Sequence, residues 1–245
     1  MNALNMVLLV VLPYAAVIVF VVGVTYRYRQ KGFTVSSLSS QFLEGRRLFW
    51  GSVPFHIGIL VVLLMHAVAI AFPALMLAWA RNPVRLIVLE VTEYVFGMSV
   101  LLGLAALLYR RLTNPRIRAV TTAMDVAIGL LLVTQVGMGL WIALDFRWGY
   151  SWFAADLAPY LWSLAKLNPE TGAVFALPLV IKLHIGGAFA IVFLVPFTRL
   201  VHFVVAPLHY LARPYQQVIW NWDRRTIRGR PAPPEAGRTE RQGAS

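Results

Sequence analysis

Five long apolar stretches divide this chain and restrict it to one kind of fold. A helix of ~20 residues crosses the ~30 Å hydrocarbon core of a bilayer, and each stretch is close to or above that length. An α-helix also pairs its own backbone groups, as a segment in lipid must. Because 59% of the residues are hydrophobic and 13% are charged, we predict an all-α integral membrane protein, a five-transmembrane-helix bundle. The predicted spans are approximately residues 7–24, 53–77, 86–108, 124–144 and 177–205.

Basic residues are distributed unevenly between the two sides of this bundle. Seventeen of the 22 Lys and Arg residues lie in the first connection, the third connection and the C-terminal region. Because loops rich in Lys and Arg remain cytoplasmic, the N-terminus is predicted outside and the C-terminus in the cytoplasm. The first stretch is followed by Arg27 and Arg29 and preceded by no basic residue, which favours a retained span over a signal peptide. The five basic residues on the outer side are Arg81, Arg85, Arg147, Lys166 and Lys182.

The chain is predicted to have one membrane domain and one tail. Residues 1–216 form the membrane domain, and residues 217–245 form a cytoplasmic, largely disordered tail that is rich in Pro, Gly and charge. The net charge of +12 follows the membrane topology, so lipid is the expected partner and nucleic acid is not. The absence of cysteine excludes disulfides and iron–sulfur clusters bound by thiolates of this chain.

Four of the five histidines lie in two of the apolar stretches. His56 and His66 belong to the second stretch, and His184 and His202 belong to the fifth. Polar rings in hydrocarbon are costly and therefore point to function. Haem iron takes axial histidine ligands, and the chain lacks the C-x-x-C-H signature of covalent attachment. Two noncovalent b-type haems, each with two histidine ligands to iron, are therefore predicted.

The predicted topology determines how the histidines pair. Antiparallel spans bring outer ends together, which pairs His66 with His184 and His56 with His202. The 18 residues between His184 and His202 correspond to five helical turns, so both rings are expected on one face. The ten residues between His56 and His66 correspond to a rise of ~15 Å and a rotation of roughly 80°. This mismatch requires tilted helices or inclined haem planes, and Pro196 can supply a bend.

Other interpretations of the same residues remain open. Four intramembrane histidines also suit a transporter that moves a metal ion or protons, and an apolar bundle can serve as a haem-free anchor for a soluble complex. Gly58, Gly186 and Gly187 lie close to the histidines in sequence. They either make room for a macrocycle or permit close helix packing.

Three stretches carry a resemblance to a known family. They are FHIGIL (Phe55–Leu60), RRLTNPRIRAVTTAMD (Arg110–Asp125) and KLHIGGAFAIVFLVPFTRLVHFVVAPLHYLARPYQ (Lys182–Gln216). Together they resemble the gamma subunit of respiratory nitrate reductase, a membrane dihaem cytochrome b. The likeness runs from the first span to about Gln216. Related cytochromes of sulfite-reduction and heterodisulfide-type complexes are the alternative.

The resemblance assigns roles to individual residues. It implies that His66 and His184 bind the distal haem, and that His56 and His202 bind the proximal haem. The family's quinol pocket lies beside the distal haem and uses a lysine near the start of the third span, where this chain has Arg85. Arginine keeps the charge but differs from lysine in geometry. The plainer interpretation of Arg85 is an interfacial side chain that reaches toward lipid headgroups.

The resemblance also implies a function and partners. A quinol-oxidising electron-transfer subunit in the cell inner membrane would pass electrons from the distal to the proximal haem. It would then deliver them to a cytoplasmic-side iron–sulfur subunit, with nitrate reduced on a separate molybdenum catalytic subunit. Arg111 and Arg199 are candidate partners of the proximal haem propionates. Their plainer interpretation is the ordinary basic flank of a membrane span.

Overall fold

The first span is one continuous helix from Ala3 to Gln30. The structure is a computed structural model that describes residues 3–30, 35 and 46–205, so the predicted tail, residues 217–245, lies outside the described residues. The span consists of α1 (Ala3–Met6), the π-helical turn η1 (Val7–Val11) and α2 (Leu12–Gln30). It is the first of five helices within the described residues that are long and apolar enough to cross a membrane.

The second and third spans are separated by a short helix. They are α3 (Arg46–Ala71) and α5 (Pro83–Thr113), with α4 (Pro73–Ala80) between them. Phe72 leaves the helical region, with φ −130° and ψ 59°, because a residue before proline is disfavoured there. The predicted extension of the second span to residue 77 is therefore wrong. Helix α5 begins where the Asn82 side chain accepts hydrogen bonds from the Val84 and Arg85 backbone amides.

The fourth span follows a tight connection that is built from two caps. The Asn114 side chain accepts a hydrogen bond from the Arg116 amide at the start of α6 (Pro115–Arg118). Thr122 and Asp125 then form a reciprocal capping box at the start of α7 (Ala123–Asp145). Helix α7 agrees with the predicted fourth span, residues 124–144, to within one residue at each end.

A group of short helices joins the fourth span to the fifth. They are α8 (Gly149–Trp152), the π-helical turn η3 (Phe153–Leu157), α9 (Ala158–Ala165) and α10 (Gly172–Ala176). The fifth span, α11 (Leu179–Leu194), continues into the 3-10 turn η4 (Val195–Phe197) and is followed by the 3-10 segment η5 (Arg199–Val205). The predicted single helix to residue 205 is wrong, because Pro196 has no amide hydrogen and Thr198 is extended.

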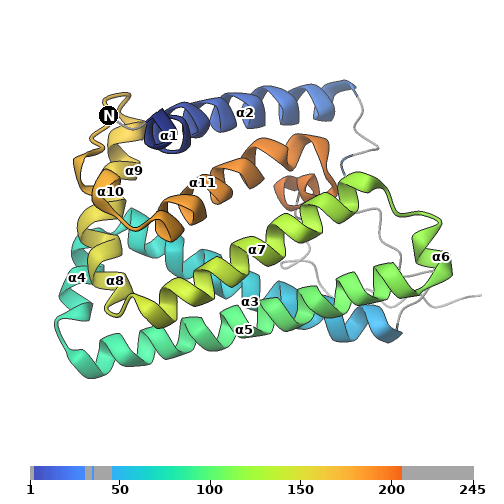
Figure 1. Ribbon diagram of the computed structural model, residues 1–245, viewed down its shortest axis with the longest axis horizontal. Coiled ribbons are helices and arrows are strands. Elements are labelled where there is room, and N and C mark those ends of the chain that lie inside the picture. The colour runs from blue at the N-terminus through green and yellow to red at the C-terminus, as the bar shows by residue number, and fades with distance from the viewer. Residues whose placement is uncertain (1–2, 31–34, 36–45, 206–245) are drawn as a thin grey trace, which may run out of the picture. The chain divides into compact units, whose positions relative to one another are not determined.

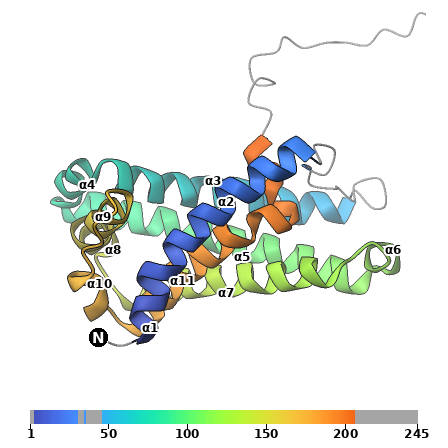
Figure 2. The ribbon, with the colours of Figure 1, turned by 90° about the horizontal axis from the view of Figure 1, so that it is seen from above.

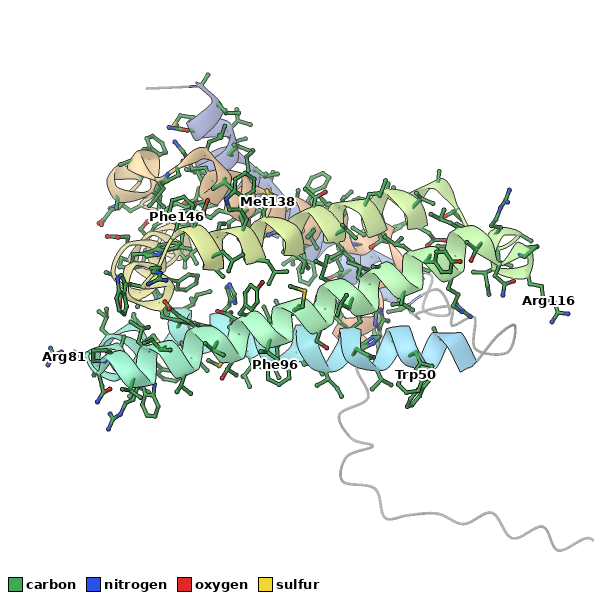
Figure 3. All side chains as sticks on the ribbon, turned by 60° about the horizontal axis from the view of Figure 1, so that its bottom comes forward. Trp50, Arg81, Phe96, Arg116, Met138 and Phe146 are labelled. Atoms are coloured by element: carbon green, nitrogen blue, oxygen red, sulfur yellow. The ribbon has the colours of Figure 1, made fainter. Side chains whose placement is uncertain are left out.

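The spans run between two ends of the helical bundle. Figure 1 shows α4, α8, α9 and α10 gathered with the start of the first span at one end, here called the α4 end, and α6 at the opposite, α6 end. In Figure 2, α2 and α11 run together and are inclined to α5 and α7. The side chains of Arg81 and Arg116 point away from the bundle at these two ends (Figure 3). The second, third and fourth connections, which the structure describes, therefore alternate between ends, as in an up-and-down bundle.

Helices α3 and α5 pack most closely because glycines line their crossing. A Cβ atom on Gly58 would lie 2.7 Å from the Phe96 carbonyl oxygen, and one on Gly103 would lie 2.6 Å from the Phe55 nitrogen. Both neighbours belong to the backbone and cannot move aside. Gly58 thus serves close helix packing, which was one of the two roles considered for it.

The interior is concentrated at the α4 end. One cluster joins Leu9, Ile142, Tyr160 and Ile185, and the Tyr160 hydroxyl donates to the Leu9 carbonyl oxygen at 2.6 Å. Elsewhere the spans present large apolar side chains outward, such as Leu60 and Leu102, with exposed fractions of 66% and 63%. Such surfaces suit lipid rather than water. Five such helices, with no strand in the described part of the chain, confirm the all-α, five-span prediction.

Candidate functional site

His56 and His202 come together from distant parts of the chain. His56 lies on α3 and His202 on η5, and their ring centroids are 6.3 Å apart with an interplanar angle of 68°. Two imidazoles on opposite sides of one metal ion would have centroids roughly 6 Å apart, given metal–nitrogen bonds of ~2.0–2.1 Å. The predicted inner pair therefore has the separation that shared coordination requires.

Hydrogen bonds orient three of the four rings in the same way. The Nδ1 atom of His56 is 2.7 Å from the Ser52 carbonyl oxygen, that of His66 is 2.8 Å from the Val62 oxygen, and that of His202 is 2.7 Å from the Arg199 oxygen. A carbonyl oxygen can only accept, so Nδ1 carries the proton in each ring. The Nε2 atom of each ring is then left with the lone pair that binds a metal.

The outer pair, His66 and His184, is held by different contacts. Phe153 packs edge-on against His66 at a centroid distance of 5.5 Å. A Cβ atom on Gly139 would lie 3.1 Å from Cε1 of His184, so glycine provides the room for this ring. The buried Nδ1 atom of His184 has no hydrogen-bond partner among the described residues.

The four histidines can be matched with the ligands that haem iron needs. No cluster of three or more His, Cys, Asp or Glu side chains suited to a metal ion occurs in the residues that the structure describes, whereas a bis-histidine haem needs only two protein ligands. Imidazoles in an apolar bundle, three of them with Nδ1 against a backbone carbonyl oxygen, suit that group. The histidines present thus fit haem better than a metal held by protein side chains alone.

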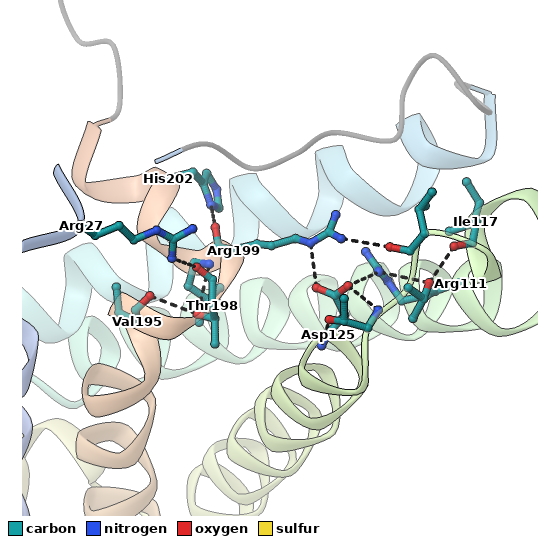
Figure 4. Close-up of polar contacts among 12 residues, drawn as sticks. Arg27, Arg111, Ile117, Asp125, Val195, Thr198, Arg199 and His202 are labelled. Atoms are coloured by element: carbon teal, nitrogen blue, oxygen red, sulfur yellow. Dashed lines mark hydrogen bonds and ion pairs between the residues drawn. The ribbon is translucent and has the colours of Figure 1, made fainter. Parts of the chain in front are cut away.

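Arg111 and Arg199 meet at a shared carboxylate near His202. Asp125 lies 2.8 Å from Arg199 Nε through one oxygen and 3.1 Å from Arg111 Nη1 through the other, and its side chain is only 8% exposed. Figure 4 shows this cluster beside η5. The possible pairing of Asp125 with Arg116 or Arg118, which their proximity in sequence suggests, does not occur. Two guanidinium groups thus share one carboxylate beside η5, and guanidinium groups are the side chains that bind carboxylates such as a propionate well.

Arg85 lies at the α4 end of the bundle, near the start of α5. Its guanidinium carbon is 5.0 Å from the centroid of the Trp79 ring, a cation–π contact. This position is compatible with both sequence interpretations, a quinol-site residue and an interfacial arginine. The contacts described for Arg85 do not link it to an outer histidine.

Two residues near the outer histidines were not selected as sites from the sequence. A Glu93 oxygen lies 2.9 Å from His66 Nδ1, and the Gln135 side-chain amide donates to the His184 carbonyl oxygen at 2.8 Å. A signal for both existed, because each is a polar residue within an otherwise apolar span. Distance along the sequence gave no indication of which histidine each would contact.

A family model and individual relatives of this chain point to the same protein family. The family model described as "Nitrate reductase gamma subunit" matches residues 5–221. The nitrate reductase gamma chain of Bacillus subtilis is 30% identical over 219 residues, which cover 84% of this chain and 93% of that protein. The respiratory nitrate reductase 1 gamma chain of Escherichia coli is 32% identical over 222 residues (89% and 98%). The respiratory nitrate reductase 2 gamma chain of Escherichia coli is 34% identical over 211 residues (84% and 92%).

Proposed function

Because the chain belongs to the nitrate reductase gamma subunit family, we propose that it is the dihaem subunit that oxidises quinol and sends electrons inward. Family membership makes it a membrane subunit of an oxidoreductase complex. The observation that carries the finer proposal is the inner histidine pair, with ring centroids 6.3 Å apart and both Nδ1 atoms bound to backbone carbonyl oxygens.

The four histidines would hold the two haems between three elements. His66 on α3 and His184 on α11 would bind the distal haem toward the α4 end, and His56 on α3 and His202 on η5 would bind the proximal haem toward the α6 end. When bound, haem iron carries one electron at a time by cycling between its ferric and ferrous states. Arg111 and Arg199 would neutralise propionates of the proximal haem.

The charges at the two ends of the bundle support an inward direction of electron transfer. The α6 end carries Arg110, Arg111, Arg116 and Arg118, so the positive-inside rule places it in the cytoplasm. Arg85 at the α4 end would donate hydrogen bonds to a quinone oxygen, and protons would leave on the outer side. Each charge that crosses the membrane is worth ~2.3 kcal/mol per 100 mV.

An iron–sulfur subunit would receive the electrons at the α6 end, and a molybdenum subunit would reduce nitrate. This chain has no cysteine to hold an iron–sulfur cluster, so the cluster would belong to the other subunit. Co-purification of a molybdenum subunit that turns over nitrate with a quinol analogue would support this acceptor. Co-purification with a sulfite- or heterodisulfide-reducing module instead would overturn it.

Optical spectra of the purified complex test the haem proposal. Reduced-minus-oxidised spectra should show two b-type haems, with His66→Ala losing the distal one and His202→Ala the proximal one. His209→Ala, which changes the fifth histidine, serves as the matched control and should retain both. A wild-type complex without b-haem bands, or ligand variants with unchanged spectra, would favour the anchor or transporter interpretations.

A further inference from the structure

An acidic side chain lies directly beside one of the proposed haem ligands. Glu93 on α5 places a carboxylate oxygen 2.9 Å from Nδ1 of His66 on α3, and the Glu93 side chain is 22% exposed. The same Nδ1 atom donates its proton to the Val62 carbonyl oxygen at 2.8 Å. The imidazole therefore has a backbone acceptor and a carboxylate on the side opposite its metal-binding nitrogen.

A second buried polar group faces Glu93 from another helix. Tyr150 on α8 is 5% exposed, and its hydroxyl lies close to Glu93. Burial raises the pKa of Tyr150, and the neighbouring Glu93 carboxylate raises it further, so the phenol keeps its proton. Tyr150 thus presents a neutral hydroxyl to Glu93.

The second acidic residue of this region has a different role. Glu90, about one turn before Glu93 on α5, accepts a hydrogen bond from the Gly149 amide at 2.8 Å. That bond connects α5 to the start of α8 and accounts for Glu90 structurally. Glu93 Oε1 and the Tyr150 hydroxyl have no well-aligned hydrogen bond among the described residues. The placement of Glu93 therefore requires another explanation.

We propose that Glu93 is a positioning residue for His66, and that its carboxylate lowers the reduction potential of the distal haem relative to the proximal one. This inference rests on the proposed function. A carboxylate beside the nonligating nitrogen attracts the Nδ1 proton, which favours this orientation of the ring and makes the imidazole a stronger electron donor. A negative charge near the iron also favours the ferric state, which carries one more positive charge than the ferrous state.

The inner pair offers an internal comparison. The Nδ1 atoms of His56 and His202 contact a serine hydroxyl and backbone carbonyl oxygens, and the carboxylate in that region, Asp125, is paired with two arginines. The effect of Glu93 should therefore be confined to the distal haem.

Redox titration of the purified complex, monitored by absorbance and by the ferric EPR signals, tests this inference. Glu93→Gln keeps the shape of the side chain and removes its charge, Glu93→Asp keeps the charge, and Glu90→Gln removes the same charge one turn away. Spectra of His66→Ala and His202→Ala identify which signal belongs to each haem.

Glu93→Gln should favour reduction of the distal haem about tenfold, which is ~59 mV for one electron. The proximal haem should titrate as in the wild type, Glu93→Asp should recover much of the wild-type potential, and Glu90→Gln should have little effect. An unchanged distal potential in Glu93→Gln overturns the inference, as does an equal shift in both haems or in Glu90→Gln. A wild-type complex without two haems overturns the proposed function instead.

Discussion

The imidazole planes of His56 and His202 are inclined at 68°, with ring centroids 6.3 Å apart. When the planes of two axial imidazoles are steeply inclined, each ring interacts with a different iron d orbital. These two d orbitals then stay nearly equal in energy. In the proposed function, the proximal ferric haem should therefore give a strongly anisotropic low-spin EPR signal. Low-temperature EPR of the oxidised complex checks this, and a signal typical of parallel imidazoles would contradict the observed ring geometry.

Asp125→Asn should destabilise the α6 end. The substitution removes the anion from between Arg111 and Arg199. Because both arginines keep partial exposure, the expected loss is ~3 kcal/mol, at the low end for a buried pair. Since the Arg199 carbonyl oxygen holds His202, proximal haem should also be lost before distal haem on heating.

Thermal denaturation in detergent, followed by haem absorbance, measures this effect. Asp145→Asn provides the matched control, because Asp145 is exposed at the other end of the same helix and contacts the Trp141 ring nitrogen. Equal destabilisation by the two variants would show that Asp125 has no special role.

Gly103→Ala should separate α3 from α5. The new Cβ atom would lie 2.6 Å from the Phe55 nitrogen and 2.7 Å from the Gly51 oxygen, and overpacking of this kind costs ~1–3 kcal/mol. Phe55 precedes His56, so the proximal haem content per protein should fall. Gly137→Ala has no atom within 4 Å of its new Cβ and should be neutral or stabilising. The pyridine haemochrome assay measures haem content per protein in both variants. Equal haem content in the two would contradict the prediction.

Arg85→Ala should slow quinol oxidation while leaving both haem spectra intact. Loss of a charged hydrogen bond to the substrate costs ~1.5–3 kcal/mol, which is about a tenfold or greater decrease in kcat/KM for a quinol analogue. Arg81→Ala removes an exposed arginine at the same end of the bundle and should have little effect. If the quinol kinetics of Arg85→Ala are unchanged, the quinol-site role is wrong, and the interfacial contact with Trp79 is the role that remains for Arg85.

The number and approximate position of the spans could be predicted because hydropathy and span length are local properties. The start of α7 was predicted to within one residue because the apolar run begins close to the capping box at Thr122. The fifth span was predicted too long because an apolar run does not reveal where its helix ends. Pro196 was recognised as a bend, but the structure shows a helix end with an extended Thr198.

The approach of His56 to His202 agrees with the pairing that antiparallel topology predicted, whereas the binding of a haem by these two rings stays a prediction. The contacts of Asp125 with the two arginines beside this pair were not predictable, because they depend on where η5 lies relative to α7. Glu93 illustrates the same limit. The sequence shows that a carboxyl group in this apolar span costs free energy, but the contact of Glu93 with His66 depends on how α3 and α5 face each other.

Both histidines of α3 lie on one unbroken helix, whereas their partners lie on two separate elements, α11 and η5. In the proposed function, the distance between the two irons is then set mainly by ten residues of rigid helix, a rise of ~15 Å. Electron tunnelling slows steeply as the gap widens. Thermal motion of η5 would change the tilt of a ring without lengthening that gap, so the transfer rate between haems should be insensitive to flexing of the bundle.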